Sequence, residues 1–213
     1  FVVADFGIPS DKVTVVHDRP ESCFHRRSLE AQHAFFERLF AQPGEDIMSH
    51  NPFTSVNSQG KVESTYQRPI LAVSSTSWTE DEEICSTLFD AILLTEQKLY
   101  RFAPRLASLY PTIYLFISGK GPMREQFDAK IKAADLRYFR VRTMWLSRQD
   151  YCNLLGSADF GISMHTSSSG IDFPMKVIDM IGSDLPTLAA RFSWYSLLTD
   201  YCIVLMRSLW KGS

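Results

Sequence analysis

The stretch ADFGISMHTSSSGIDFPMKVIDM, residues 158–180, joins three unlike segments in a fixed order. The apolar run 158–164 predicts a buried strand, and the run that follows residue 173 predicts a helix beginning at Pro174, a residue favoured in the first helical turn. A polar loop with one histidine, several hydroxyl groups and a glycine separates the two. A strand, a loop and a helix in this order are typical of one unit of a parallel α/β sheet.

The same unit recurs on the amino-terminal side of this stretch, and one more strand follows it. Strands are predicted at 69–75, 112–118, 138–143, 158–164 and 185–190, and helices at 79–92 with Thr79 as cap, 123–134, 148–155 and from 174. Strands that are apolar throughout and alternate with helices indicate a parallel sheet covered on both faces. We therefore expect residues 69–190 to form a doubly wound, Rossmann-like α/β domain.

The amino-terminal third has a different pattern. KVTVV, residues 12–16, predicts a short buried strand, and SLEAQHAFFERLF, residues 28–40, predicts a helix. Residues 41–68 are rich in Pro, Gly, Asn and Ser, which predicts a flexible linker. A loop of that length is unusual inside one compact domain, so we place a domain boundary there.

Composition excludes several classes of protein. With 22 Lys and Arg against 24 Asp and Glu among 213 residues, the chain has no basic excess for nucleic-acid binding. The four cysteines form no CxxC pair, which excludes a zinc ribbon or a disulfide-dense scaffold and fits a reducing compartment. The longest apolar run, 201–206, is far shorter than the roughly 20 residues of a spanning helix.

Three predicted loops follow strands directly, at 75–79, 119–122 and 165–174. Ligands of open α/β sheets bind at the carboxyl ends of the strands, so these loops are the candidate site. In the second loop, Gly119 and Gly121 permit close approach of a ligand, while Lys120 and Arg124 add charge for a phosphate. The alternative is a tight turn before a helix, and the spacing of a Walker motif is absent.

The third loop, HTSSSG at 165–170, offers hydroxyl and amide groups for a diphosphate or for sugar hydroxyls. A surface turn is the alternative, and position at the sheet edge favours binding. Lys176 and Asp179 are three residues apart on the following helix, where they suit a phosphate and a ribose, or else form an ordinary surface ion pair. We expect Trp78, in the first loop, to pack.

No Asp-x-Asp pair at a strand end and no HExxH occur, so we expect no metal. The serines of the first loop have no His and Asp in triad order, which disfavours a hydrolase.

Four stretches together resemble the chitobiosyldiphosphodolichol β-mannosyltransferases, GT-B-fold glycosyltransferases of the dolichol pathway. They are HDRP…QHAFFERL (17–39), SSTSWTEDEE (74–83), ISGKGPMRE (117–125) and LLGSADFGISMHTSSSGIDFPMKVIDM (154–180). The resemblance covers roughly residues 12–190. It implies inverting transfer of mannose from GDP-mannose to GlcNAc2-diphosphodolichol, in a β1,4 linkage, at the cytosolic face of the endoplasmic reticulum membrane. No cofactor or metal is implied.

The resemblance also implies which residues bind the donor, with Asp179 on its ribose. The set is Ser77, Gly119, Lys120, Gly121, Arg124, His165, Ser168, Ser169, Gly170, Asp172, Lys176 and Asp179. Residues 1–40 would be the end of the acceptor-side domain, 41–68 the linker, 69–190 the GDP-sugar-binding domain, and 191–213 an atypical tail where the resemblance stops. The membrane anchor and much of the acceptor site, with the catalytic base, are expected before Phe1.

Expected partners are the donor, the lipid-linked acceptor and other mannosyltransferases of the pathway, with no nucleic acid. The alternative is an inactive donor-binding fragment that acts only through association with partners.

Overall fold

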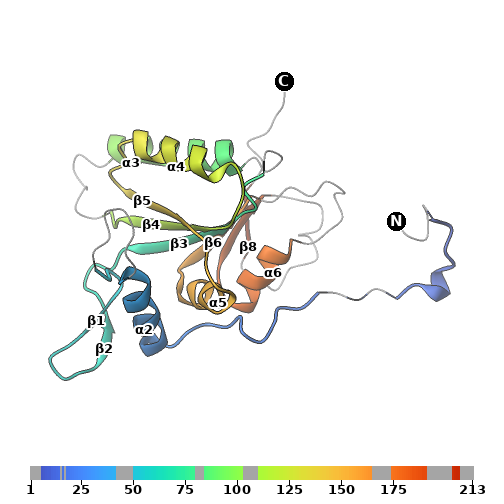
Figure 1. Ribbon diagram of the computed structural model, residues 1–213, viewed down its shortest axis with the longest axis horizontal. Helices are drawn as coiled ribbons and strands as arrows, with labels where there is room; N and C mark the ends of the chain where they lie inside the picture. The colour runs from blue at the N-terminus through green and yellow to red at the C-terminus, as the bar shows by residue number, and fades with distance from the viewer. Residues whose placement is uncertain are drawn as a thin grey trace.

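The chain forms a six-stranded parallel sheet with helices on both faces (Figure 1). This computed structural model describes residues 6–14, 16, 18–41, 50–79, 84–102, 110–164 and 174–190, together with the backbone of 203–206. The sheet strands are β3 (Ile70–Ser75), β4 (Ile113–Ser118), β5 (Phe139–Met144), β6 (Phe160–Ser163), β7 (Thr187–Ala190) and β8 (Ile203–Met206). The longer helices are α2 (Leu29–Phe40), α3 (Phe89–Phe102), α4 (Arg124–Ala133), α5 (Arg148–Ser157) and α6 (Met175–Gly182).

The strand order across the sheet is β5-β4-β3-β6-β7-β8. In chain order this reads third, second, first, fourth, fifth, sixth, which is the doubly wound order of nucleotide-binding folds. The chain builds outward from β3 to β5, then crosses back through α5 to β6, so the order reverses between β3 and β6. The prediction of a doubly wound α/β sheet is confirmed. Part of the tail that we expected to be atypical, residues 203–206, supplies the sixth strand, parallel to β7.

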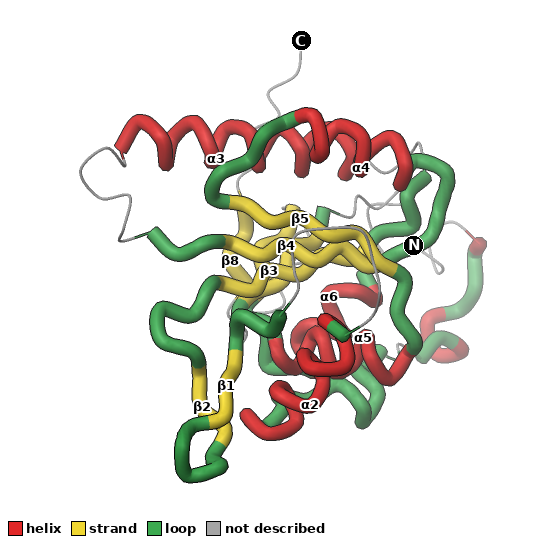
Figure 2. The backbone as a smooth tube through the Cα atoms, turned by 60° about the vertical axis from the view of Figure 1, so that its left-hand side comes forward, coloured by secondary structure: helices red, strands yellow, loops and turns green. Residues whose placement is uncertain are grey.

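Alternation along the strands separates two apolar layers. Leu71 and Val73 of β3 belong to the cluster that contains residues of α2, α5 and α6. Ala72, between them, belongs to the cluster that contains Phe127 of α4 and Ile92 of α3. Figures 1 and 2 show the matching arrangement, with α3 and α4 over one face and α2, α5 and α6 over the other.

The structure corrects the prediction of a strand at 12–16. A short 3-10 helix, η1 (Ser10–Lys12), occupies its start, and the side chain of Val16 is 85% exposed. Nothing in the described part of the chain pairs with this segment. Because a strand needs a neighbour for its backbone groups, β-branched composition alone does not make one here.

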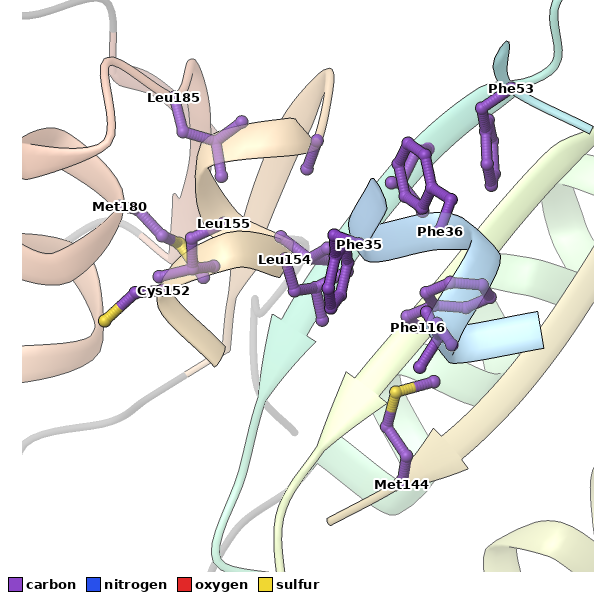
Figure 3. Close-up of a cluster of buried hydrophobic side chains, with 14 of the residues drawn as sticks. Phe35, Phe36, Phe53, Phe116, Met144, Cys152, Leu154, Leu155, Met180 and Leu185 are labelled. Atoms are coloured by element: carbon purple, nitrogen blue, oxygen red, sulfur yellow. The ribbon is translucent and has the colours of Figure 1, made fainter. Parts of the chain in front are cut away.

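The structure also corrects the interpretation of 41–68 as a loop throughout. An antiparallel hairpin lies within it, formed by β1 (Thr54–Val56) and β2 (Val62–Ser64). Phe53, just before the hairpin, is fully buried, with its ring centroid 4.7 Å from that of Phe36 on α2 and 6.5 Å from that of Phe116 on β4. Figure 3 shows this aromatic group among the other buried side chains. The turn residues that suggested a linker instead close the hairpin, and α2 packs on the sheet of the 69–190 region. The assignment of residues 1–40 to an acceptor-side domain stays a prediction.

Helix positions agree with the sequence except after β3. There a π-helical segment, η2 (Ile84–Leu88), leads into α3, which ends at Phe102 rather than at Ile92. The acidic first turn expected behind Thr79 lies at 80–83, outside the described residues.

One ion pair joins the amino ends of β3 and β6, and its loss is our first testable prediction. Asp159 accepts hydrogen bonds from the Arg68 guanidinium at 2.7 and 2.9 Å and from the Leu71 backbone N–H at 2.7 Å. Asp159→Ala removes the carboxylate partner of both donors in a partly buried place, so we expect the free energy of unfolding in urea to fall by about 2 kcal/mol.

The control is Arg38→Ala, which breaks the exposed ion pair of that arginine with Asp150. It should cost less than about 1 kcal/mol. Equal losses for the two variants would contradict the prediction.

Candidate functional site

The carboxyl edge of the sheet brings two of the three candidate loops together. Ser75 and Ser118, the last residues of β3 and β4, are register partners, so the loop after β3 and the turn after β4 start side by side. β6 ends at the same edge at Ser163, and its loop spans 165–173. Five predicted donor-binding residues lie in that loop, outside the described residues: His165, Ser168, Ser169, Gly170 and Asp172.

The two glycines of the β4 turn face the backbone of the β3 loop. A Cβ at Gly119 would lie 1.9 Å from the carbonyl oxygen of Thr76, and a Cβ at Gly121 would lie 2.0 Å from that of Ser77. The Met123 N–H also donates to the Trp78 carbonyl at 3.1 Å. The glycines therefore allow two loops to interlock, a role that the sequence could not distinguish from close approach to a ligand.

Trp78, in the loop after β3, packs beneath the β4 turn against α4. Its side chain is fully buried, and its ring centroid lies 5.1 Å from that of Phe127 on α4. The packing role expected for this residue is confirmed. Ser77, one residue earlier, is exposed at the edge, as a donor-binding residue needs to be.

Arg124 has hydrogen-bond partners within the protein, and its donor-binding role stays a prediction. Its Nε donates to the Thr143 hydroxyl at 3.0 Å and its Nη2 to the Thr143 carbonyl at 3.2 Å. The Thr143 hydroxyl in turn donates to the Asp128 carboxylate at 2.7 Å. The guanidinium thus ties α4 to β5, and contact with a phosphate would compete with these bonds.

The edge carries an aromatic residue that the sequence analysis missed. Trp145 follows β5 directly and is 57% exposed, and the Lys120 ammonium lies 4.4 Å from its ring centroid. This is a cation–π contact. The available signal was a tryptophan immediately after a predicted strand, at the edge where ligands bind. The contact places the flat ring of the loop after β5 beside a positive charge of the turn after β4.

On the face of the sheet opposite α3 and α4, α6 carries the partly buried Lys176 and Asp179. Burial raises the pKa of the Asp179 carboxyl from 3.8 to about 6, Arg148 acts in the opposite direction, and Glu21 adds to the rise. A carboxyl with a raised pKa near a ligand-binding edge is a candidate functional group. It becomes charged close to neutral pH, which suits hydrogen bonding to sugar hydroxyls.

A second missed residue is Tyr151 on α5. Its hydroxyl and that of Ser75, the last residue of β3, share a hydrogen bond of 2.9 Å. Burial raises the pKa of the phenol, so it stays protonated. The bond connects the crossover helix to the strand end where the sheet order reverses.

The described residues thus place Ser77, Gly119, Lys120 and Gly121 on two interlocked loops and Lys176 and Asp179 on α6. In the part of the chain that the structure covers, no group of three potential metal ligands occurs, and no helix is both long and apolar enough to cross a bilayer. The absence of a metal stays a prediction.

Sequence comparison shows which known proteins this chain resembles. The chain is 38% identical over 191 residues to chitobiosyldiphosphodolichol beta-mannosyltransferase of Homo sapiens, a match that covers 85% of this chain and 40% of the relative. The Dictyostelium discoideum protein of the same name is 36% identical over 203 residues, covering 90% of this chain and 40% of the relative. Over most of its length the chain is similar to the chitobiosyldiphosphodolichol beta-mannosyltransferases. It spans about two fifths of the length of these relatives.

A third relative of this chain has a different name. UDP-glycosyltransferase TURAN of Arabidopsis thaliana is 35% identical over 202 residues, covering 85% of this chain and 43% of the relative. The name of the Arabidopsis relative includes UDP, whereas the names of the other two include the sugar and the acceptor but no nucleotide. No family model matches the chain.

The solved structures that are similar to this chain have low sequence identity to it. The catalytic domain of cholesterol-alpha-glucosyltransferase from Helicobacter pylori aligns with a TM-score of 0.40 at 13% identity, over 59% of this chain and 66% of that one. The C-terminal domain of a Francisella tularensis glycosyl transferase group 1 family protein gives 0.43 at 12%, over 66% and 69%. The fold assignment rests on the strand order and not on these likenesses.

Proposed function

We propose that this chain is the donor-binding part of a β-1,4-mannosyltransferase that transfers mannose from GDP-mannose to GlcNAc2-diphosphodolichol. The observation that carries the proposal is that Ser77 and the Gly119–Gly121 turn, which match the family, follow β3 and β4 at the carboxyl edge of a doubly wound sheet. Loops at that position bind nucleotides in such folds. The acceptor is suggested by the names of the relatives, and the cytosolic face of the endoplasmic reticulum by the dolichol pathway.

Each part of the donor has a matching group on the edge. The N–H groups of Lys120 and Gly121 in the β4 turn, with the Lys120 and Lys176 ammonium groups, suit the diphosphate, because cations and amides stabilise phosphate oxygens. The Gly119 N–H is not among them, since it donates to the Met144 carbonyl at 3.0 Å. Asp179 suits the ribose hydroxyls. The Trp145 ring offers a face on which a purine can stack.

Charge on the leaving diphosphate is then balanced by lysines, and we propose that no metal is required. Inversion at the anomeric carbon needs a base that takes the proton of the acceptor hydroxyl. We assign no residue of this chain to that role.

A second candidate is donor binding without turnover. All of the candidate site residues are ones that we propose for the donor, and none is proposed for the acceptor or as the base. In that case the chain acts only through association with partners.

The test is calorimetric titration with GDP-mannose, GDP and UDP-glucose, followed by a transfer assay on a chitobiosyl-lipid acceptor with and without EDTA. Binding of GDP-mannose with weaker binding of UDP-glucose supports the proposal, and transfer distinguishes an enzyme from a binding domain. Tighter binding of the UDP-sugar would refute the donor assignment. Loss of transfer in EDTA that a divalent ion restores would refute the metal-free assignment.

Lys176→Ala is expected to weaken GDP binding about tenfold, because a hydrogen bond from an ammonium to a phosphate is lost. The matched control is Lys132→Ala, an exposed lysine in the last turn of α4. It should leave the Kd unchanged. An unchanged Kd in both variants removes Lys176 from the site.

A further inference from the structure

We propose that Tyr151 is a positioning residue of the nucleotide-binding edge. Its hydroxyl group fixes the end of β3 relative to the crossover helix α5, and a segment from the amino-terminal part of the chain holds its ring in place. This inference rests on the proposed donor-binding function. It adds a residue that neither the sequence motifs nor the relatives' names assign.

The first step is the place of the hydrogen bond. Ser75 ends β3, and β3 lies beside β6, so Ser75 stands at the reversal of strand order. Tyr151 reaches it from the first turns of α5, the element that carries the chain across the sheet. Their 2.9 Å bond therefore ties the crossover helix to the carboxyl end of β3, beside the reversal of strand order.

The second step is the packing of the ring. Phe24 is 4% exposed and meets the Tyr151 ring edge to face, with centroids 5.9 Å apart. Phe24 belongs to residues 20–27, which we call the strap. A Cβ on Gly156 of α5 would lie 2.3 Å from the carbonyl oxygen of His25, and a Cβ on Gly182 of α6 would lie 2.4 Å from Cβ of Pro20. The strap thus lies directly against both helices.

The third step is the polar anchoring of the strap. The Arg27 N–H donates to the Gly156 carbonyl at 2.8 Å. At the other end, Nε of Arg148 donates to Glu21 at 3.2 Å, and the same guanidinium lies 5.5 Å from the Phe24 ring centroid. The strap is thus bonded at both ends, and its buried Phe24 packs on the Tyr151 ring. This packing holds the Tyr151 hydroxyl toward Ser75.

The consequence concerns the two faces of the site. Ser75 precedes the loop that interlocks with Gly119 and Gly121. Burial raises the pKa of the Tyr151 phenol, and the nearby Asp179 carboxylate adds to the rise. The Tyr151 hydroxyl therefore fixes the strand end that leads into the phosphate-side loop, and it lies near the carboxylate that we propose for the ribose. Holding such groups at a fixed separation before the ligand arrives lowers the entropic cost of binding.

The experiment is a double-mutant cycle on GDP affinity. Tyr151→Phe, Ser75→Ala and the double variant are titrated with GDP, and their unfolding in urea is measured separately. Tyr151→Phe keeps the ring on Phe24 and removes only the oxygen. We expect each single variant to bind GDP roughly three- to tenfold more weakly and the double variant no more weakly than either.

The matched control is Tyr114→Phe. Tyr114 lies on the amino half of β4, on the same face of the sheet, with its ring 5.2 Å from that of Phe53. The change is chemically identical but remote from the carboxyl edge, so the Kd should not move.

Four results would overturn the inference, in different ways. Wild-type GDP affinity in Tyr151→Phe, or additive effects in the double variant, means that the hydroxyl has no positioning role, while the donor-binding function survives. A wild-type chain that binds neither GDP nor GDP-mannose overturns the positioning role together with the proposed function. A lower unfolding free energy with an unchanged Kd shows a purely structural role and also overturns it.

Discussion

Replacing Gly119 with alanine is expected to lower the free energy of unfolding by about 3 kcal/mol and to remove measurable GDP binding. The added methyl group would lie 1.9 Å from the Thr76 carbonyl oxygen and 2.9 Å from its carbonyl carbon. Both are backbone atoms, so no side-chain rotation relieves the clash. The β3 loop must move away from the β4 turn, and the phosphate-binding arrangement that we propose moves with it.

Urea unfolding and GDP titration check this prediction. The control is Gly60→Ala in the turn of the hairpin, where φ is +76° and no atom lies within 4 Å of the added Cβ. That variant should lose about 1 kcal/mol from backbone strain alone and should bind GDP normally. If Gly119→Ala unfolds no more easily than Gly60→Ala, the loops are not interlocked as described.

Asp179→Asn is expected to have opposite effects on stability and binding. Since burial holds the pKa of this carboxyl near 6, charging it at pH 7.5 opposes folding, and a neutral amide removes that cost. The variant should therefore be more stable than wild type. It should also bind GDP about tenfold more weakly, because an amide replaces a charged acceptor for the ribose hydroxyls.

The sign of the pH dependence follows from linkage. The folded pKa, about 6, lies above the ordinary 3.8, so between these values the folded state binds more protons than the unfolded state. The contribution of Asp179 to stability is complete below about pH 3.8 and is lost as the pH rises through 6. The stability difference between variant and wild type should thus be close to zero at pH 4 and grow up to pH 7.

Unfolding and GDP titrations at several pH values provide the measurement. Asp184→Asn is the matched control, an exposed aspartate two residues beyond the end of α6. Its φ of 51° is one that asparagine also adopts readily. Wild-type GDP binding should strengthen as the pH rises through 6, and Asp179→Asn should lose this dependence. An Asp179→Asn chain with wild-type affinity at pH 7.5 would exclude the carboxylate from the ribose site.

Local pattern was sufficient for the sheet. Each core strand is a continuous apolar run followed by turn residues, and this signal depends only on neighbours in the chain, so β3 to β7 were predicted close to their observed bounds. The prediction of a strand at 12–16 was wrong because it needed more than neighbours in the chain. Composition shows that a segment can be extended, but not whether another strand pairs with it. The hairpin at 54–64 was missed because short strands between turn residues look like a loop.

Within the candidate site, the sequence located the edge better than the roles of its residues. Ser77, Lys120 and Asp179 lie on or beside the edge, as the order of strand and loop requires. The assignment of Arg124 to a phosphate did not anticipate Thr143, which takes up its guanidinium. Trp145 and Tyr151 carried no motif and were missed.

The sequence by itself determined the alternation of strands and helices, the edge at which we expect a ligand and the resemblance to the mannosyltransferases, since all three depend on residue order. Only the tertiary structure decided which partner each side chain meets. The interlock of Gly119 with the β3 loop and the bond from Tyr151 to Ser75 join segments more than 40 residues apart in the sequence. Such contacts are fixed by how the helices pack on the sheet, and no local periodicity encodes them.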